Sequence, residues 1–381
     1  MNSKNESKGV RMKLTAEREK LLGPLQAVIG VVERRQTMPV LANVLLNVRD
    51  GRMSITATDL EVELLEVELV ASAEVNVQQA GDITVPGRKL LDILRALPEK
   101  TNVSLLLEAE KLIVKGGRSR FSLSTLPASE FPLIEDINAQ QTVQVARKEL
   151  QRLLEKTHFS MAQQDVRYYL NGMLLEIDGT NLRAVATDGH RLAVCEAPLA
   201  AKAKTSQQVI VPRKGVLELQ RILDSEGNTD LAIGTNHVRA QIGDVRFTSK
   251  LIDGKFPEYS RVIPAAPPAL IKADRDALRQ ALQRTAILSN EKYRGIRITV
   301  KKKVVTVQAH NPEQEEAEEE IEVNYDGGDL EVGFNVNYLL DALAAIDGAE
   351  VEIGLSDSNS SCLIRSPGTT DCRYVVMPMR L

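Results

Sequence analysis

The sequence lacks the motifs and apolar segments that mark most enzymes and membrane proteins. It has no GxxxxGK(S/T), GxSxG or HExxH motif, so it offers no phosphate-cradling loop and no recognisable hydrolase site. No apolar stretch approaches the roughly 18 residues that a membrane span needs. No apolar signal segment begins the chain, so we expect a cytoplasmic protein with no membrane partner.

Metal ligands and disulfide partners are also scarce. The three cysteines, Cys195, Cys362 and Cys372, are odd in number and have no CxxC spacing, which argues against a disulfide framework and against a zinc site. The four histidines are scattered without metal-ligand spacing. We therefore expect no metal and no cofactor.

A basic charge balance is missing as well. The formal net charge is −4, which argues against a conventional DNA-binding protein. The charge is unevenly distributed, because the segments with helical periodicity sum to a positive charge and the rest of the chain is negative. This contrast predicts one basic helical surface on an otherwise acidic body.

The chain does contain a pattern that occurs three times, about 125–130 residues apart. Each copy opens on an amphipathic helix, at 16–32, 146–162 and 274–290. A triplet such as Ala-Thr-Asp follows an apolar run, then a strand leads into a second helix, and a segment such as FSLSTLPASEFP closes the copy. Repeats of this length are triplicated domains rather than solenoid units.

Runs typical of strands, such as 44–48 and 173–177, lie between the helices and are separated by turn signals such as Asp50-Gly51. Each copy thus has two helices and about eight strands, which predicts an α+β fold with two helices packed on antiparallel sheets. We expect a disordered or vector-derived extension and three domains, at residues 1–11, 12–139, 140–269 and 270–381.

The segment Thr187–Arg191 (TDGHR) is the candidate for catalysis. A His beside an Asp can act as a general base, but it needs a nucleophile and an orienting group. A hydrolase or nuclease that uses Asp188 and His190 remains one hypothesis. A turn whose polar atoms satisfy the local backbone, and which lines a partner groove, is the favoured interpretation.

The run NPEQEEAEEE (311–320) is strongly acidic. A metal site is one interpretation, but calcium loops need spaced Asp or Asn and a Gly turn. Charge on an edge strand, which prevents indiscriminate strand pairing, fits better. A basic pair with apolar neighbours in the first copy, and an apolar pair in the third, complement the run: Arg118, Arg120, Phe121, Leu123, Ile287 and Leu288. These segments predict an intermolecular joint, and two unrelated surface runs are the alternative.

Two further segments carry exposed or apolar groups of interest. Tyr168-Tyr169 follow Arg167, and such a pair either packs in a core or stacks on unpaired bases. The C-terminus (374–381) is apolar where termini are usually polar, so it is buried or forms a binding surface. Its methionines suit a surface that adapts to several partners.

The chain resembles the bacterial sliding clamps, the β subunits of DNA polymerase III. The motifs that carry the resemblance lie in all three copies and cover residues 12–381: SRFSLSTLPASEFP, QDVRYYLNGMLLE, ATDGHRLAV, VIVPRKG, ILSNEKYRG, NPEQEEAEEE, GFNVNY and YVVMPMRL. The resemblance implies the DNA clamp fold and a homodimeric ring in which two chains join head to tail. It also implies a non-enzymatic processivity factor that encircles double-stranded DNA.

The resemblance implies three sets of functional residues. Those near DNA are Arg35, Arg88, Lys89, Gln164, Tyr168, Tyr169 and Arg213. In the dimer interface, Arg118 and Arg120 would face Glu315, Glu316, Glu318 and Glu319, with Phe121, Leu123, Ile287 and Leu288 as the apolar part. The peptide-binding groove would comprise Leu170, Thr187, Gly189, His190, Arg191, Leu192, Pro257, Arg261, Val262, Asn335, Tyr338, Val376, Met377, Pro378, Met379 and Arg380.

The implied partners of the groove are the replicative DNA polymerase III alpha subunit and the clamp loader, together with other DNA polymerases, mismatch-repair proteins and ligase. Because the chain has no P-loop, ring opening would depend on that separate, ATP-driven loader. The third copy departs from the others, since GFNVNYLLDAL lacks the basic residues of VPGRK and VPRKG. Contacts with DNA should therefore be uneven. A monomeric scaffold that binds peptides without encircling DNA is the remaining alternative.

Overall fold

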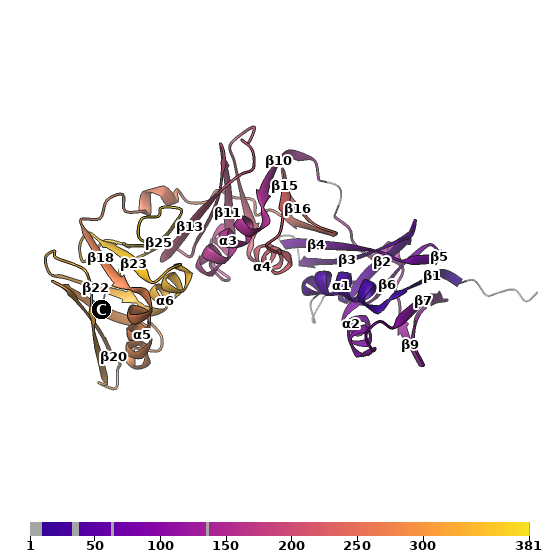
Figure 1. Cartoon of the computed structure of the whole chain (residues 1–381), viewed down its shortest axis with the longest axis horizontal. Helices are drawn as coiled ribbons and strands as arrows, with labels where there is room; N and C mark the ends of the chain where they lie inside the picture. The colour runs from indigo at the N-terminus through magenta and orange to yellow at the C-terminus, as the bar shows by residue number, and fades with distance from the viewer. Residues whose placement is uncertain (1–9, 33–37, 62–64, 135–136, 381) are drawn as a thin grey trace, which may run out of the picture. The chain divides into compact units, whose positions relative to one another are not determined.

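The structure is a computed structural model that describes residues 10–32, 38–61, 65–134 and 137–380. These residues form six α-helices and 25 strands, arranged in four antiparallel sheets (Figure 1). The chain divides into two compact units, residues 1–148 with 214–252 and residues 149–213 with 253–381.

The first unit contains two sheets. The five-stranded sheet has the order β5 (Asn76–Gln79), β1 (Val10–Glu17), β7 (Asn102–Glu108), β8 (Lys111–Gly116) and β9 (Ser119–Ser124). The eight-stranded sheet has the order β10 (Ala139–Ala146), β15 (Asn228–Gly234), β16 (His237–Ile242), β17 (Val245–Lys250), β4 (Leu65–Glu74), β3 (Arg52–Glu61), β2 (Asn43–Arg49) and β6 (Gly81–Pro86). Its helices are α1 (Arg18–Val28), α2 (Gly87–Ala96) and nearly all of α4 (Arg213–Ile222).

The second unit repeats this plan. Its eight-stranded sheet has the order β14 (Gln207–Pro212), β11 (Gly172–Asp178), β12 (Asn181–Thr187), β13 (Arg191–Pro198), β25 (Cys372–Val376), β24 (Cys362–Arg365), β23 (Glu350–Leu355) and β18 (Ala269–Asp274). A four-stranded sheet has the order β21 (Glu316–Glu322), β20 (Val304–His310), β19 (Gly295–Lys301) and β22 (Leu330–Asn335). The helices are most of α3 (Arg147–Thr157), α5 (Arg275–Thr285) and α6 (Val336–Ala345).

Short 3-10 helices follow the first helix of each repeat and occur in several loops. They are η1 (Ile29–Val31), η2 (Pro39–Ala42), η3 (Ala128–Glu130), η4 (His158–Ser160), η5 (Tyr168–Asn171), η6 (Tyr259–Val262) and η7 (Ala286–Leu288). Among the described residues, no helix is long and apolar enough to cross a bilayer.

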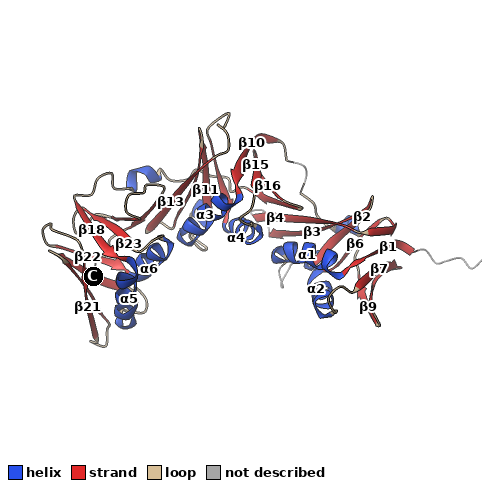
Figure 2. Cartoon of the chain, in the orientation of Figure 1, coloured by secondary structure: helices blue, strands red, loops and turns tan. Residues whose placement is uncertain are grey.

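Local sequence explains these elements. Leu150, Leu153, Leu154 and Thr157 are the buried positions of α3, at the spacing that places them on one helical face. Strand β18 alternates buried and exposed residues along its length, as expected for a half-buried strand. In each unit the helices pack on sheet, α1 on β3 and β4 and α5 on β20 and β21 (Figure 2). The expected fold class, α+β with two helices per repeat on antiparallel sheets, is confirmed.

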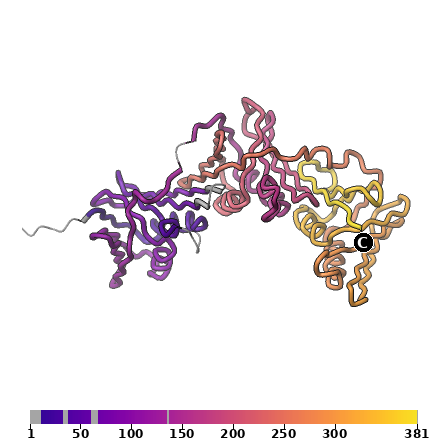
Figure 3. The backbone as a smooth tube through the Cα atoms, turned by 180° about the vertical axis from the view of Figure 1, so that it is seen from behind, coloured from indigo at the N-terminus to yellow at the C-terminus, as the bar shows by residue number. Residues whose placement is uncertain are grey.

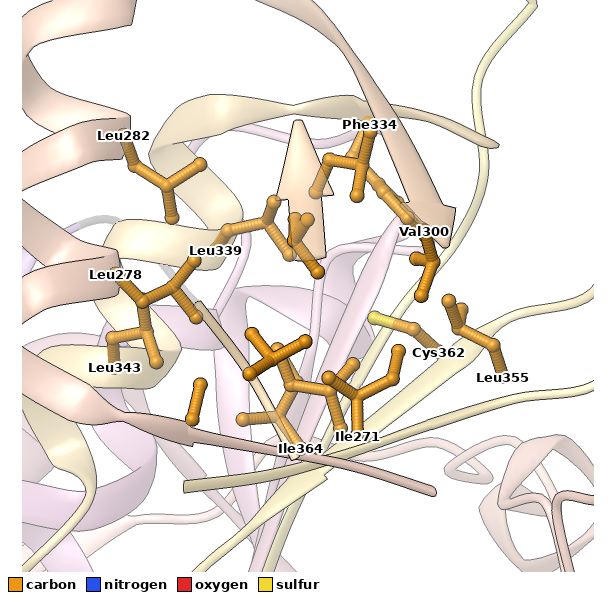
Figure 4. Close-up of a pocket in the computed structure, with 15 residues that line it drawn as sticks. Ile271, Leu278, Leu282, Val300, Phe334, Leu339, Leu343, Leu355, Cys362 and Ile364 are labelled. Atoms are coloured by element: carbon orange, nitrogen blue, oxygen red, sulfur yellow. The ribbon is translucent and has the colours of Figure 1, made fainter. Parts of the chain in front are cut away.

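The third repeat shows how these faces build a core. Leu278 and Leu282 of α5 meet Leu339 and Leu343 of α6 over the strands of its two sheets (Figure 4). A cavity of about 30 Å³ remains between them, lined by aliphatic side chains, Phe334 and the Cys362 thiol. Burial raises the pKa of the Cys362 thiol to about 12. This thiol is therefore a packing group and stays protonated.

The middle repeat is shared between the two units. Its strands β15–β17 continue the sheet of the first repeat through the β17·β4 pair, and its strands β11–β14 continue toward the third repeat through β13·β25.

Two expectations from the sequence need adjustment. Strand β1 begins at Val10, inside the segment that we assigned to an extension.

The second adjustment concerns the cysteines. Cys195 and Cys372 form a disulfide, a single bond that the sequence argument against a disulfide framework did not anticipate. They are 177 residues apart in sequence, and the register of β13 and β25 places them opposite each other. Spacing along the chain carries no signal for such a pair.

An ion pair joins the first and second repeats within the first unit. Asp59, from the Ala-Thr-Asp triplet on β3, is fully buried and pairs with Lys214 in the first turn of α4. A buried carboxylate requires a charged or hydrogen-bonding partner, because desolvation of an ion costs several kcal/mol. Lys214 therefore ties α4 to the edge of the first repeat.

We expect Lys214→Ala to lower the free energy of unfolding by about 3 kcal/mol, because it removes a charge partner of the buried Asp59 carboxylate. Lys20→Ala, at an exposed position on α1, is the matched control and should change stability little. Urea unfolding followed by circular dichroism measures both. Equal stability of the two variants would contradict the role of the ion pair.

Candidate functional site

The segment Thr187–Arg191 forms a turn between β12 and β13, and its polar side chains hydrogen-bond to the backbone of the same turn. The Asp188 carboxylate accepts the backbone N–H groups of His190 (2.9 Å) and Arg191 (3.0 Å). The Thr187 hydroxyl donates to the Arg191 carbonyl (2.6 Å) and accepts from the Gly189 N–H (3.1 Å). Gly189 has a φ of +90°, which a side chain disfavours. The interpretation of this segment as a turn is confirmed, and Asp188 is committed to holding its shape.

Arg191 connects this turn to the third repeat within the second unit. Its guanidinium bonds Asp188 (3.1 Å), pairs with Asp341 of α6 and donates to the Phe159 carbonyl (2.7 Å). The same group lies 4.6 Å from the centroid of the Tyr338 ring. Burial raises the pKa of the Tyr338 hydroxyl, with the Asp188 charge as a further cause. Tyr338 therefore stays neutral and presents an aromatic face to the arginine.

A cleft of about 200 Å³ lies beside the turn. Half of the expected groove residues line it: Leu170, Thr187, Gly189, Arg191, Leu192, Pro257, Val262 and Met377. The walls are mainly apolar, and Val262 and Met377 are both more than a third exposed. A concave apolar wall with a few polar groups is the usual form of a peptide or small-molecule site.

The other expected groove residues lie outside the lining of this cleft: His190, Arg261, Asn335, Tyr338, Val376, Pro378, Met379 and Arg380. Several of them anchor its surroundings. The Met377 N–H donates to the His190 carbonyl (2.9 Å), and the Met379 N–H donates to the Gly333 carbonyl (2.9 Å). Asn335 caps α6 by accepting the Asn337 N–H (2.9 Å). The segment near the chain end thus bonds both the turn of the second repeat and strand β22 of the third (Figure 3).

Five lining residues were not expected: Arg167, Tyr169, Glu258, Tyr259 and Val375. Tyr259 is fixed by polar contacts, since its hydroxyl donates to Glu176 (3.1 Å) and accepts from Arg183 (3.1 Å). Its burial raises the pKa of the hydroxyl. No local motif marks Tyr259, because its partners come from β11 and β12 far along the chain.

Three of the residues expected near DNA, Gln164, Tyr168 and Tyr169, lie in one segment before β11. Gln164 has a φ of +55° and is exposed. Tyr168 is half exposed and meets Tyr169 edge to face, with ring centroids 5.9 Å apart. Arg167 binds Asp165 through two guanidinium nitrogens, which lowers the pKa of that carboxyl to about 2. Tyr168 faces solvent, whereas Tyr169 lines the cleft.

The remaining residues of this set occur at the starts of helices. Arg88 and Lys89 are exposed in the first turn of α2, and Arg88 donates to the Val32 carbonyl. Arg213 begins α4, is partly buried and donates to the Met161 carbonyl (3.4 Å). Desolvation lowers the pKa of Arg213, and the nearby charge of Arg191 adds to this. Arg35 lies outside the described residues.

The expected interface residues lie on two strands that end their sheets and on η7. Arg120, Phe121 and Leu123 belong to β9, and Arg118 lies in the turn before it. Glu316, Glu318 and Glu319 belong to β21, directly after Glu315. Ile287 and Leu288 belong to η7, and the Ile287 side chain is 74% exposed. Glu319 already binds Arg284 of α5 (2.6 Å), which lowers the pKa of its carboxyl.

Comparison with known proteins covers the whole of this architecture. Family models of the DNA polymerase III beta subunit match its N-terminal domain at residues 12–135, its central domain at 144–258 and its C-terminal domain at 260–380. The beta sliding clamp of Pseudomonas putida is 55% identical over 372 residues, which are 97% of this chain and 100% of that protein. The beta sliding clamp of Escherichia coli strain K12 is 51% identical over 371 residues, with the same two coverages.

Solved structures give the same result. The DNA polymerase III subunit beta of Pseudomonas aeruginosa superposes with a TM-score of 0.94 at 53% identity, over 97% of this chain and 100% of that one. The Caulobacter crescentus beta sliding clamp superposes with a TM-score of 0.91 at 40% identity, over 97% and 100% of the two chains. The chain therefore belongs to the DNA polymerase III beta subunit family, the DNA sliding clamps that serve as processivity factors in DNA replication.

Proposed function

We propose that two copies of this chain close head to tail into a ring around double-stranded DNA, and that the cleft beside Thr187–Arg191 holds peptide segments of replication and repair proteins. The ring would contain six repeats, three from each chain, with boundaries near residues 139 and 269. A heterologous interface closes into a ring when its rotation permits. The β17·β4 pair joins the first repeat to the second, and the β13·β25 pair joins the second repeat to the third. The observation that carries the proposal is that these two joints pair equivalent strands in the same way.

The two internal joints have the same register. In the first, Phe247 of β17 lies opposite Leu69 of β4. In the second, Tyr374 of β25 lies opposite Ala193 of β13. Leu69 and Ala193 in turn pair with the alanines of the two Ala-Thr-Asp triplets, Ala57 and Ala186. At each joint, an aromatic residue thus lies opposite the residue that pairs with the alanine of the triplet.

In the third repeat, β21 is the strand equivalent to β4 and β13, but no strand of a following repeat pairs with it in the described part of the chain. Ala309 is the alanine of its triplet, and it pairs with Ala317 of β21. In the first repeat, β9 is the strand equivalent to β17 and β25, because Arg120-Phe121 of β9 corresponds to Arg246-Phe247 and Arg373-Tyr374. The repeat therefore predicts that Phe121 lies opposite Ala317 of the other copy, Arg120 opposite Glu318, and Ser119 opposite Glu319.

Burial supports this third joint. Phe247 and Tyr374 are fully buried at the internal joints, whereas Phe121 is partly exposed. At the second joint, the Phe159 ring of η4 lies 5.9 Å from the Tyr374 ring. Ile287 of η7 occupies the position of Phe159 in the third repeat, so its exposed side chain would pack on Phe121. Covering such apolar groups would stabilise the dimer by about 25 cal/mol per Å² of buried apolar surface.

The register can be tested with cysteines at the position that the native disulfide occupies in the second joint. We expect Ser119→Cys with Glu319→Cys to give a covalent dimer on oxidation, because this pair corresponds to Cys372 and Cys195. Non-reducing gel electrophoresis and intact mass measure the yield.

Ser119→Cys with Glu320→Cys is the matched control, since the side chain of Glu320 points to the opposite face of β21. It should give little covalent dimer. Adding Ile287→Ala and Leu288→Ala to the first pair should lower the yield by weakening the ring. Equal yields from the two cysteine pairs would contradict the register.

The helices supply charge for the duplex. Each of α1 to α5 carries more Lys and Arg than Asp and Glu, whereas α6 carries Asp341 and no basic residue. Non-specific phosphate contacts of this kind are salt-dependent and carry no sequence preference, which suits a ring that slides. Contacts of this chain with DNA should be weakest at α6. The ring would work in the cytoplasm, where bacteria replicate their DNA.

A ring that encircles DNA is retained by topology rather than by affinity. We expect protein loaded on nicked circular DNA to stay bound in high salt, and to be lost when a restriction enzyme linearises the circle. Gel filtration of labelled protein with the DNA measures retention. The Ile287→Ala, Leu288→Ala variant is the control and should be lost from the circle faster. Equal loss from circular and linear DNA would contradict encirclement and favour a monomeric scaffold.

The partners of the cleft would be the DNA polymerase III alpha subunit, the ATP-driven clamp loader, other DNA polymerases, mismatch-repair proteins and ligase. Leucine and phenylalanine side chains of a linear peptide would fill the apolar walls, with few but strong anchor contacts. Tethering a polymerase in this way raises its effective concentration at the primer end.

The chain itself would catalyse no reaction, since the Asp188 carboxylate bonds the backbone of the turn and the Arg191 guanidinium rather than the His190 ring.

We expect Val262→Asp to weaken binding of a Leu- and Phe-containing clamp-binding peptide at least tenfold, because it places a charge in the apolar wall of the cleft. Leu270→Asp is the matched control, because Val262 and Leu270 are 43% and 42% exposed but Leu270 is not part of the cleft lining. Isothermal titration calorimetry measures both affinities. Equal affinities would contradict the assignment of the groove.

A further inference from the structure

The disulfide lies in the strand pair that joins the second repeat to the third. Cys195 of β13 and Cys372 of β25 are directly opposite in the register, with Cα atoms 4.1 Å apart. The Glu196 N–H donates to the Asp371 carbonyl (2.8 Å) just beyond them. This spacing is typical of a non-hydrogen-bonded cross-strand pair, where side chains approach most closely. The backbone alone thus brings the two sulfur atoms within reach of each other.

A guanidinium group lies against both sulfur atoms. Arg152 of α3 places Nη1 3.3 Å from the Sγ atom of Cys195 and 3.3 Å from that of Cys372. The group is held in place by Asp371 (2.9 Å) and Glu149 (2.9 Å). A positive charge at this distance favours the thiolate form of a reduced cysteine, which is the form that attacks a disulfide.

The two cysteines differ in their access to solvent. Cys195 is fully buried, whereas Cys372 is partly exposed and lines a cleft of about 690 Å³ together with Arg152, Asp371 and Tyr374. A small thiol or disulfide from solution would therefore meet Cys372 first. Cys195 can then act only as the resolving partner from inside the sheet.

We propose that Cys195 and Cys372 are a reversible redox pair that locks the β13·β25 joint when a small-molecule disulfide, such as oxidised glutathione, accumulates. The Cys372 thiolate attacks one sulfur of the small disulfide, forms a mixed disulfide and releases one small thiolate. The Cys195 thiol, as it loses its proton, attacks the Cys372 sulfur, forms the protein disulfide and releases the second small thiolate. In total, two cysteine thiols are oxidised and one small disulfide is reduced to two thiols. Excess small thiol reverses both steps.

Two considerations make the pair a switch rather than a permanent cross-link. Proteins that act on DNA inside a cell meet a reducing thiol pool, where disulfides are usually transient and redox-sensing. The locked strands also form one wall of the cleft, since Leu192 lies opposite Val375 three residues along the same pair of strands. This second point rests on the proposed function of the cleft. The thiol chemistry itself does not depend on that function.

The test counts thiols in the full-length protein after incubation with mixtures of reduced and oxidised glutathione. N-ethylmaleimide labelling in denaturant, followed by intact mass, should show three labels in reduced protein and one in oxidised protein, since Cys362 stays free. Cys362→Ser is the matched control and should still lose two labels on oxidation. Cys372→Ser should lose the protein disulfide. Three labels at every ratio of the two glutathiones, or one label even in excess reduced glutathione, would overturn the proposal.

Two further measurements separate the roles of the groups. Arg152→Gln should slow disulfide formation at neutral pH and move its pH profile to higher pH, and Arg152→Lys should restore part of the rate. A purely structural role of Arg152 would leave the pH profile in place. Hydrogen exchange of the β13 and β25 amides should be at least tenfold slower in the oxidised protein. Equal exchange in both states would overturn the lock, whatever the outcome of the ring and peptide experiments.

Discussion

The pairing of edge strands between repeats is the constraint on which the rest of the structure depends. An unpaired edge presents a row of backbone donors and acceptors, and each repeat has one edge of this kind on either side. The β17·β4 and β13·β25 pairs satisfy four such edges within the chain and place the same aromatic position at each joint. Strands β9 and β21 end their sheets in the described part of the chain. Pairing β9 of one copy with β21 of another would continue this pattern, as the proposed ring requires.

Side chains then make each joint different on this common frame. The first joint is tied by the buried Asp59 and by Lys214, and the second by Arg191 between Asp188 and Asp341. The Asp of the Ala-Thr-Asp triplet serves in both, but it reaches the next repeat directly in one and through an arginine in the other. The second arrangement leaves the turn beside Arg191 open to solvent. The Ala-Thr-Asp triplet therefore holds two repeats together in the first repeat, and in the second it borders a cleft.

Much of this architecture could be predicted from the sequence, because its signals are local. The threefold pattern, the two helices of each repeat and the turn at Thr187–Arg191 follow from periodicity and turn chemistry. Contacts that depend on the tertiary arrangement could not be predicted: the Cys195–Cys372 disulfide, the Arg284–Glu319 ion pair and the contacts of Tyr259 join residues that are distant in sequence. Tyr168 and Tyr169 are neighbours in the sequence, yet one faces solvent and the other lines the cleft, since a 3-10 turn separates their directions.

The composition of the third edge suits the proposed role of a joint that can open. Its two internal counterparts bury aromatic residues completely and are held by a continuous chain, so parting them would expose apolar surface. The edge of β21 instead carries Glu316, Glu318 and Glu320, which remain well solvated when no partner is present. Charge on an edge strand also discourages pairing with an unrelated strand. A basic complement such as Arg120 would then both select the correct partner and keep the closed joint weak enough to be reopened, because exposed ion pairs add little stability.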